Sequence, residues 1–278
     1  MAKLMDVVKT IVAGCIVEHS GCRIIQRGDS PQVRAAKKQA SDIGRKLTNH
    51  RTMQRTLYFL MGANFKPTDF FLTLTFDDLH LPRNRAEAME AVQRYVRLLR
   101  KYRALQGQDV RYIYCIESKH GVGRYHIHMV LNATQKDVET ICSLWDYGMI
   151  DWEYIGWSKE RGKLQQRGQK AGECYKILAR YMTKEVQPVG ARNYSHSQGL
   201  KKPEITVTFM SEPEVERRKL METPAGCQQL GYTDYRNEWG RFWSVSYYQY
   251  REAGAIAVQR KRPGLYDGET QVILRGHL

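Results

Sequence analysis

The 278-residue sequence is poor in acidic residues, and it lacks long apolar runs and internal repeats. Its 29 Asp and Glu stand against 44 Lys and Arg, which gives a formal net charge of +15. This charge favours a polyanionic partner, because lysine and arginine neutralise phosphates and release their counterions. No apolar run is long enough to cross a bilayer, so no membrane partner is expected. Without a repeat, a solenoid is not expected either.

Two common motifs are also missing. The six cysteines include no Cys-x-x-Cys pair, and no secretory leader is recognisable, so we expect reduced thiols and a cytoplasmic location. The P-loop pattern Gly-x-x-x-x-Gly-Lys-Ser/Thr is absent, since the closest string, residues 156–163, has the wrong spacing and is followed by leucine. The sequence therefore predicts no helicase motor.

Residues 124–131 read as a β-strand that carries two histidines. Because side chains alternate across a strand, His126 and His128 project to one face. The opposite face carries Tyr125, Ile127, Met129 and Leu131. Imidazole is a common ligand of divalent metals. Taken alone, the pair is equally typical of a half-buried strand with two partly solvated histidines.

A carboxylate is expected beside these histidines. Residues 111–117 read as another strand, and the two glycines within residues 118–123 suit a hairpin loop. In the resulting antiparallel pair, Glu117 lies close to His126. Glu117, His126 and His128 would then form a two-histidine, one-carboxylate site that suits Mg²⁺ or Mn²⁺ with phosphate and water, whereas Zn²⁺ would bind more tightly. By itself, Glu117 reads as an ordinary charge at a hairpin end.

A strand at residues 70–76 offers a mildly polar face that matches the histidine side of such a sheet. Thr73 and Thr75 lie on this face with Phe71, and the other face carries Phe70, Leu72, Leu74 and Phe76. A strand with one solvated face explains the alternation equally well.

Residues 168–186 read as a helix that places a tyrosine and a lysine on one side. Its apolar stripe comprises Cys174, Ile177, Leu178 and Tyr181. By periodicity alone, Tyr181 would be a core residue. Lys184 falls on the same stripe, however, and an ammonium is unfavourable there unless it reaches an anion or water. A tyrosine and a lysine aimed at a metal suit attack on a phosphodiester, with the phenol as nucleophile and the ammonium neutralising the developing charge.

These segments resemble a known family. Residues 71–76, the pair His126 and His128, and the string Tyr181-Met182-Thr183-Lys184 occur in the order of the three motifs of HUH endonucleases. Within that superfamily, the chain resembles the rolling-circle replication initiators of bacterial plasmids, phages and small single-stranded DNA viruses. Residues 197–203 also resemble initiators from bacterial mobile elements, and the resemblance covers about residues 64–209.

The resemblance implies a compact antiparallel sheet of about five strands with flanking helices, a ferredoxin-like or RRM-like core in which the histidine strand is central. It implies nicking of one DNA strand at an origin, with a tyrosine joined to the 5′ phosphate and a free 3′ hydroxyl that primes synthesis. By motif position, His126 and His128 match the metal ligands, with Glu117 as the third. Tyr181 matches the nucleophile, and Lys184 matches the lysine that follows it.

A single catalytic tyrosine is expected. Some relatives carry two tyrosines one helical turn apart, but the other helix tyrosine here, Tyr175, lies six residues before Tyr181 and well round the helix. Tyr175 is therefore interpreted as structural.

The implied partners are single-stranded DNA or an origin hairpin, with a helicase and a polymerase of a bacterial host whose cytoplasm would hold the protein. DNA contacts are expected from Thr73, Thr75, Arg124, Lys201 and Lys202. A relaxase or single-strand transposase of the same superfamily is the nearest alternative. A DNA-binding regulator that does not cut is a more distant one.

Three parts are expected in an α+β fold. Residues 1–63 would form a basic helical segment, residues 64–210 the endonuclease domain, and residues 211–278 a C-terminal extension. In the domain, a helix at residues 86–105 would pack on the sheet and keep its basic residues outside, namely Arg94, Arg97, Arg100, Lys101 and Arg103.

The ends of these parts carry further expectations. Residues 204–209 would be the last strand of the domain. In the extension, the aromatic-rich residues 239–250 suit either a hairpin that packs on the domain or a surface that stacks single-stranded bases. A basic tail would begin at residue 259.

Overall fold

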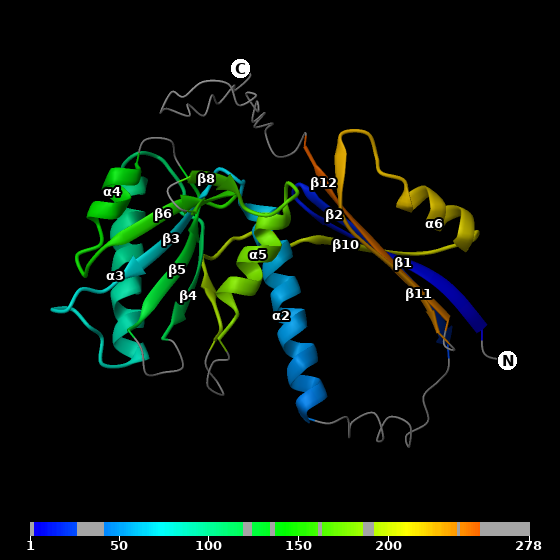
Figure 1. Cartoon of the computed structure of the whole chain (residues 1–278), viewed down its shortest axis with the longest axis horizontal. Coiled ribbons are helices and arrows are strands. Elements are labelled where there is room, and N and C mark those ends of the chain that lie inside the picture. The colour runs from blue at the N-terminus through cyan, green and yellow to red at the C-terminus, as the bar shows by residue number, and fades with distance from the viewer. Residues whose placement is uncertain are drawn as a thin grey trace.

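The computed structural model describes residues 3–26, 42–118, 124–133, 137–160, 163–185, 192–237 and 240–250. Two five-stranded antiparallel sheets lie on either side of a long helix, α2 (Asp42–Asn64) (Figure 1). This confirms the predicted α+β class, with an antiparallel sheet and flanking helices. The basic tail predicted from residue 259 lies outside the described residues. Within the described ranges, no helix combines the length and apolar character that a membrane crossing requires.

The first sheet, here called the central sheet, contains the predicted hairpin. Its order is β6 (Ile150–Tyr154), β3 (Phe70–Thr75), β5 (His126–Leu131), β4 (Tyr112–Glu117) and β9 (Ser195–His196). The histidine strand β5 is central, as predicted. Strands β4 and β5 pair with Glu117 opposite His126. A separate two-stranded ribbon is formed by β7 (Trp157–Glu160) and β8 (Lys163–Gln166).

Helices cover both faces of the central sheet. On one face, α3 (Arg85–Ala104) begins after Asn84, whose side chain accepts a hydrogen bond from the Glu87 amide. Together with α4 (Val138–Ser143), it encloses a core that includes Leu72, Leu74, Val92, Leu99, Ile127, Met129 and Ile141. On the other face, α2 and α5 (Glu173–Met182) pack over Phe71, Ile113 and Val130. The polar side chains of β3 and β5 therefore face α5.

The prediction that Arg103 faces solvent is wrong. Its side chain is fully buried, and its guanidinium donates to Asp137 (2.9 Å) and to the side-chain and backbone oxygens of Asn132 (2.7 and 2.8 Å). Burial of an arginine is tolerated here because a carboxylate and two further acceptors satisfy its donors. Helical periodicity cannot reveal partners that come from a distant loop.

The second sheet joins both ends of the described chain. Its order is β10 (Glu204–Phe209), β1 (Lys3–Ala13), β2 (Ile16–Gln26), β12 (Gly240–Gln249) and β11 (Cys227–Asn237). The helical prediction for residues 1–63 is therefore wrong for residues 3–26, although α2 confirms a helix over its second half. The strand at residues 204–209 exists, but it pairs with β1 and not with the central sheet.

Local sequence explains the β1–β2 hairpin. The β-branched residues Val7, Val8, Ile11 and Val12 favour a strand over a helix. The two strands are joined at Gly14 and Cys15, with Ala13 paired to Ile16. Gly14 has φ +59°, and a Cβ there would lie 2.4 Å from the Gly62 carbonyl oxygen of α2. Glycine thus serves both the turn and the close approach of α2.

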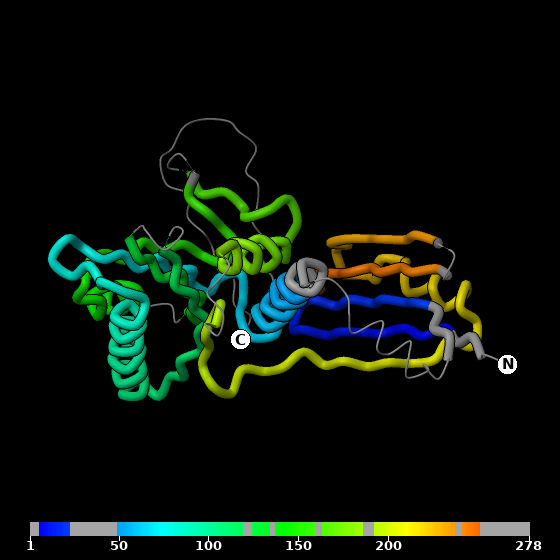
Figure 2. Tube along the Cα trace, turned by 90° about the horizontal axis from the view of Figure 1, so that it is seen from below, coloured from blue at the N-terminus to red at the C-terminus, as the bar shows by residue number. Residues whose placement is uncertain are grey.

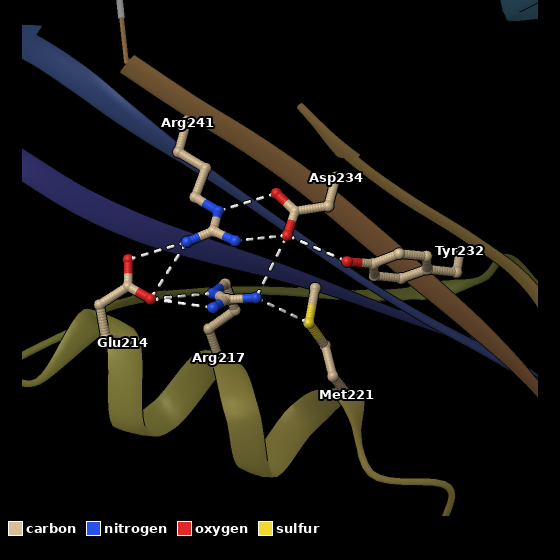
Figure 3. A network of polar contacts seen from close by, with 6 residues as sticks. All are labelled: Glu214, Arg217, Met221, Tyr232, Asp234 and Arg241. Atoms are coloured by element: carbon tan, nitrogen blue, oxygen red, sulfur yellow. Dashed lines mark hydrogen bonds and ion pairs between the residues drawn. The ribbon is translucent and has the colours of Figure 1, made fainter. Parts of the chain in front are cut away.

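The aromatic-rich segment forms a strand of a hairpin, β11–β12, and this hairpin pairs with β2. Helix α6 (Pro213–Met221) is fastened to it by an ion-pair network (Figure 3). Asp234 on β11 accepts from Arg217 (3.3 Å) and from Arg241 (2.8 Å), and Glu214 pairs with both arginines. The network holds α6 against the face of the second sheet that also buries Trp243 and Val245.

A short link connects the two sheets. The segment after β9 leads into β10, which runs along the edge of the second sheet (Figure 2). At the end of α2, the Asn64 side chain accepts from the Lys201 amide (2.7 Å) and donates to the Lys201 carbonyl (2.8 Å). Asn64 is buried, so these bonds satisfy its amide and anchor the link.

Gly21 is a steric requirement of the second sheet. A Cβ at Gly21 would lie 2.2 Å from Nε1 of Trp243, its cross-strand neighbour. We expect Gly21→Ala to lower the free energy of unfolding by about 1–3 kcal/mol through overpacking, measured by urea denaturation. Gly231→Ala is the matched control, because the nearest atom there is Ser246 Oγ at 3.4 Å. Equal losses in both variants would contradict the steric explanation.

Candidate active site

Strand register gathers polar side chains on the α5 side of the central sheet. Thr73 of β3 lies opposite His128, and Thr75 lies opposite His126. On the other flank, Glu117 lies opposite His126. Because paired residues share a face, these five side chains project toward α5, away from the α3 core.

His128 is the centre of the site. Its Nε2 lies 2.7 Å from Glu117 Oε2 and 3.3 Å from the Tyr181 hydroxyl, and its Nδ1 lies 3.2 Å from Thr73 Oγ1. Since a carboxylate only accepts, Nε2 carries the proton in this network, and the Thr73 hydroxyl donates to Nδ1. Burial lowers the pKa of His128, against the raising effect of Glu117. Phe71 stacks on the imidazole with ring centroids 5.9 Å apart.

Glu117 joins His128 to Lys184. Its Oε1 accepts from the Lys184 ammonium at 2.7 Å, while Oε2 contacts His128. Burial opposes ionisation of this carboxyl, but the hydrogen bonds from Lys184 and His128 outweigh it and lower the pKa of Glu117. The carboxyl is therefore an anion at neutral pH. Partial burial alone would lower the pKa of Lys184, yet its bonds with Glu117 and Tyr181 raise it.

Tyr181 lies at the surface beside these groups. Helix α5 buries Cys174, Tyr175, Leu178, Ala179 and Met182, whereas Ile177 and Tyr181 are 39% and 38% exposed. The single apolar stripe predicted for this helix is thus wrong for Ile177 and Tyr181. The Tyr181 ring packs edge-on against His128 and Phe71, and the Lys184 Nζ lies 4.0 Å from its centroid. Burial raises the pKa of Tyr181, against the lowering effect of Lys184, so the phenol is neutral at neutral pH.

The end of α5 is fixed by contacts that the sequence did not suggest. The Thr183 hydroxyl donates to the Ala179 carbonyl (2.6 Å), and the His50 ring of α2 lies 2.9 Å from the Thr183 carbonyl oxygen. Glu185 accepts from the Ser118 amide at 3.1 Å, next to Glu117. Glu185 directly follows Lys184 in sequence, which was the one available signal. His50 had none, because it lies in a distant helix.

Tyr175 does not reach the site. It is fully buried, and its hydroxyl donates to the Phe65 carbonyl at 2.7 Å. Burial raises the pKa of Tyr175 far above the ordinary value. These contacts agree with the interpretation of Tyr175 as a structural residue.

The other residues expected at the site lie around it. The Thr75 hydroxyl donates to the Met149 carbonyl (3.1 Å), and Arg124 forms an ion pair with Asp78. Lys201 and Lys202 are exposed in the link to β10. In the described ranges, no hydrogen bond or ion pair connects either lysine side chain with Tyr181 or the groups around it.

The expected metal ligands converge in part. Among the described residues, no three His, Cys, Asp or Glu side chains are grouped so as to hold a metal ion. Glu117 and His128 do meet, at 2.7 Å, and His126 lies opposite Glu117 on the same face. One ionised carboxylate and imidazoles are donors that divalent cations accept in proteins. The chemistry of this donor set fits a divalent cation.

Comparison with known proteins gives one match. Residues 69–186 match the family model of the ORF2-type replication-associated protein. Searches of curated proteins and of solved structures found no match. The matched span begins immediately before β3 and ends just after Lys184, so it contains Glu117, both histidines and Tyr181. The match supports a replication-associated protein of the Rep type, with a role in replication initiation.

Proposed function

We propose that the chain is a metal-dependent endonuclease and strand transferase of the HUH superfamily. It nicks and rejoins single-stranded DNA at a replication origin through a 5′-phosphotyrosine, and so initiates rolling-circle replication. The observation that carries this proposal is the position of the Tyr181 hydroxyl, 3.3 Å from His128 Nε2 on the surface of the molecule. A phenol exposed beside an imidazole, a carboxylate and an ammonium is the arrangement expected for transfer of a phosphoryl group.

In the proposed step, the Tyr181 oxygen forms a bond to phosphorus, and the bond from phosphorus to the 3′ oxygen breaks. The phenolic proton is lost, and the leaving 3′ oxygen ends as a hydroxyl, so atoms and charge balance. Lys184 stabilises the charge that develops on the phosphate. Glu117 holds the ammonium over the Tyr181 ring, and Thr73 orients His128. Attack of the 3′ hydroxyl on the phosphotyrosine reverses the step and rejoins the strand.

A divalent cation, Mn²⁺ or Mg²⁺, held by Glu117, His126 and His128 would polarise a phosphate oxygen. Strand separation and synthesis would come from a helicase and a polymerase of a bacterial host, in whose cytoplasm the protein would act. Arg124, Thr75, Lys201 and Lys202 remain candidate DNA contacts in this proposal.

A covalent-adduct assay tests the proposal. Incubation with a randomised single-stranded DNA library and Mn²⁺ is expected to give a protein–DNA adduct that survives denaturation. Removal of the ion with a chelator should abolish the adduct, and added Mn²⁺ should restore it, because a bound cation stabilises the charge of the transition state. Duplex DNA of the same composition is the control. Salt-sensitive binding without any adduct would favour the DNA-binding regulator instead.

A further inference from the structure

A second polar region lies on α5, beyond the residues of the candidate active site. A cavity of about 450 Å³ opens between α2, α5 and the second sheet. Its lining includes Arg51 and Arg55 of α2, Lys176 and Arg180 of α5, and Glu18 of β2. We call this cavity the basic groove. The two helices supply four cations to it, and none of the contacts that build the Tyr181 site uses them.

Three of these cations are available to a ligand. Arg51, Lys176 and Arg180 are exposed, and among the described residues none of the three forms an ion pair. The acid Glu173, which also lines the groove, directs its carboxylate to the backbone amides of residues 169 and 170 (2.8 and 3.2 Å). Unpaired cations on facing elements raise the local concentration of anions.

Arg55 differs because it is already paired. Its guanidinium forms an ion pair with Glu18 and lies 5.2 Å from the centroid of the Phe59 ring. Glu18 is largely buried, with 17% of its side chain exposed. The carboxylate therefore lies in the wall of the groove and holds Arg55 in the way that a phosphate oxygen would.

The basic groove is continuous with the candidate active site. Residues four apart on a helix lie one above the other, about 6 Å apart along the axis. Lys176 and Arg180 therefore form one ridge of α5, and Ile177 and Tyr181 form the adjacent ridge. Ile177 lines the groove, and Tyr181 lies one turn further along the same exposed face. A strand whose phosphate lies at Tyr181 can extend along α5 into the groove.

We propose that the basic groove binds backbone phosphates of the single-stranded DNA on one side of the phosphate that Tyr181 attacks. Arg51, Lys176 and Arg180 contact these phosphates directly, and Arg55 exchanges Glu18 for a phosphate when the strand enters. This inference rests on the proposed function, since it assigns a place to the flanking part of the same substrate. It gives the second sheet a role in DNA binding, because β2 supplies Glu18.

Binding measurements with paired charge changes test this inference. The probe is a fluorescent oligothymidylate of about 20 nucleotides, and every protein carries Tyr181→Phe so that no strand is cut. The triple variant R51Q/K176Q/R180Q is expected to bind at least about tenfold more weakly at low salt. The slope of log affinity against log salt should fall by roughly 2, since each phosphate contact on a single strand contributes about 0.7. Glu18→Gln should bind more tightly, because it frees Arg55 and removes a negative charge.

The matched control is R94Q/R97Q/K101Q, which makes the same charge change on the exposed surface of α3, across the central sheet from α5. It should leave the salt slope nearly unchanged. Equal losses in the two triple variants, or weaker binding by Glu18→Gln, would overturn the inference. Tighter binding of an RNA probe of equal length would overturn the assignment to DNA. Circular dichroism verifies that each variant is folded.

The two proposals can fail separately. If the protein with Tyr181 intact forms no adduct but the groove variants change DNA binding as expected, the groove stands and the nicking reaction fails. If the adduct forms and the groove variants bind DNA normally, the reaction stands and the groove inference fails.

Discussion

Tyr181→Phe is expected to abolish the covalent protein–DNA adduct while leaving the fold intact. The change removes only the hydroxyl, which lies 3.3 Å from His128 Nε2, and it keeps the ring that packs on Phe71 and under Lys184. A covalent step cannot proceed without its nucleophile, so the loss should be complete within detection. Denaturing electrophoresis of the Mn²⁺-containing reaction with labelled DNA measures it.

Tyr175→Phe is the matched control. It removes a hydroxyl from the same helix, but one that is buried and donates to the Phe65 carbonyl. The adduct should persist, and only stability should fall, by about 1–3 kcal/mol, because the carbonyl loses its partner. An adduct that survives in Tyr181→Phe would identify another nucleophile.

Arg103→Met is expected to have the largest effect on stability. The variant leaves the buried carboxylate of Asp137 without its cation, and it leaves two oxygens of Asn132 without a donor. Removing one partner of a buried ion pair costs about 3–5 kcal/mol, which urea denaturation measures as a large fall in the unfolding midpoint.

Arg97→Met makes the same substitution at an exposed position of α3 and should change stability by less than about 0.5 kcal/mol. A double variant, R103M/D137L, should recover part of the loss, because the uncompensated charge is gone. A small effect of Arg103→Met alone would mean that water or another donor reaches Asp137.

The hairpin that carries the histidines could be predicted from sequence because its signals are local. Alternation identified β4 and β5, the glycines identified the loop, and antiparallel pairing then placed Glu117 opposite His126. Which histidine meets the acid was not predictable. Direct pairing favoured His126, yet His128 makes the hydrogen bond, because side-chain rotamers and the twist of the sheet decide contacts at this scale.

Helix phase was harder to predict. Cys174 and Leu178 were correctly expected to be buried, but the stripe continued through Tyr175 and Met182 and not through Ile177 and Tyr181. The difference is about one residue of rotation, and the packing of α2 on α5 sets it. Arg103 failed for a related reason, since its partners lie on a distant loop.

The second sheet could not be predicted because its pairings are non-local. β1 pairs with β10, and β2 pairs with β12, so each interior strand needs a partner from the far end of the sequence. The charges of residues 34–55 suggested helix, and that interpretation was extended too far toward the N-terminus. The β-branched residues of β1 were the signal that should have limited it.

The strand order also constrains synthesis on the ribosome. β1 and β2 emerge early as a hairpin, yet β2 gains its second neighbour only when residues 240–249 have been made. Until then, one border of the nascent hairpin offers unpaired amides and carbonyls to any other extended chain. A stop codon ahead of β12 would make that temporary hazard permanent, and the released fragment would be prone to aggregate.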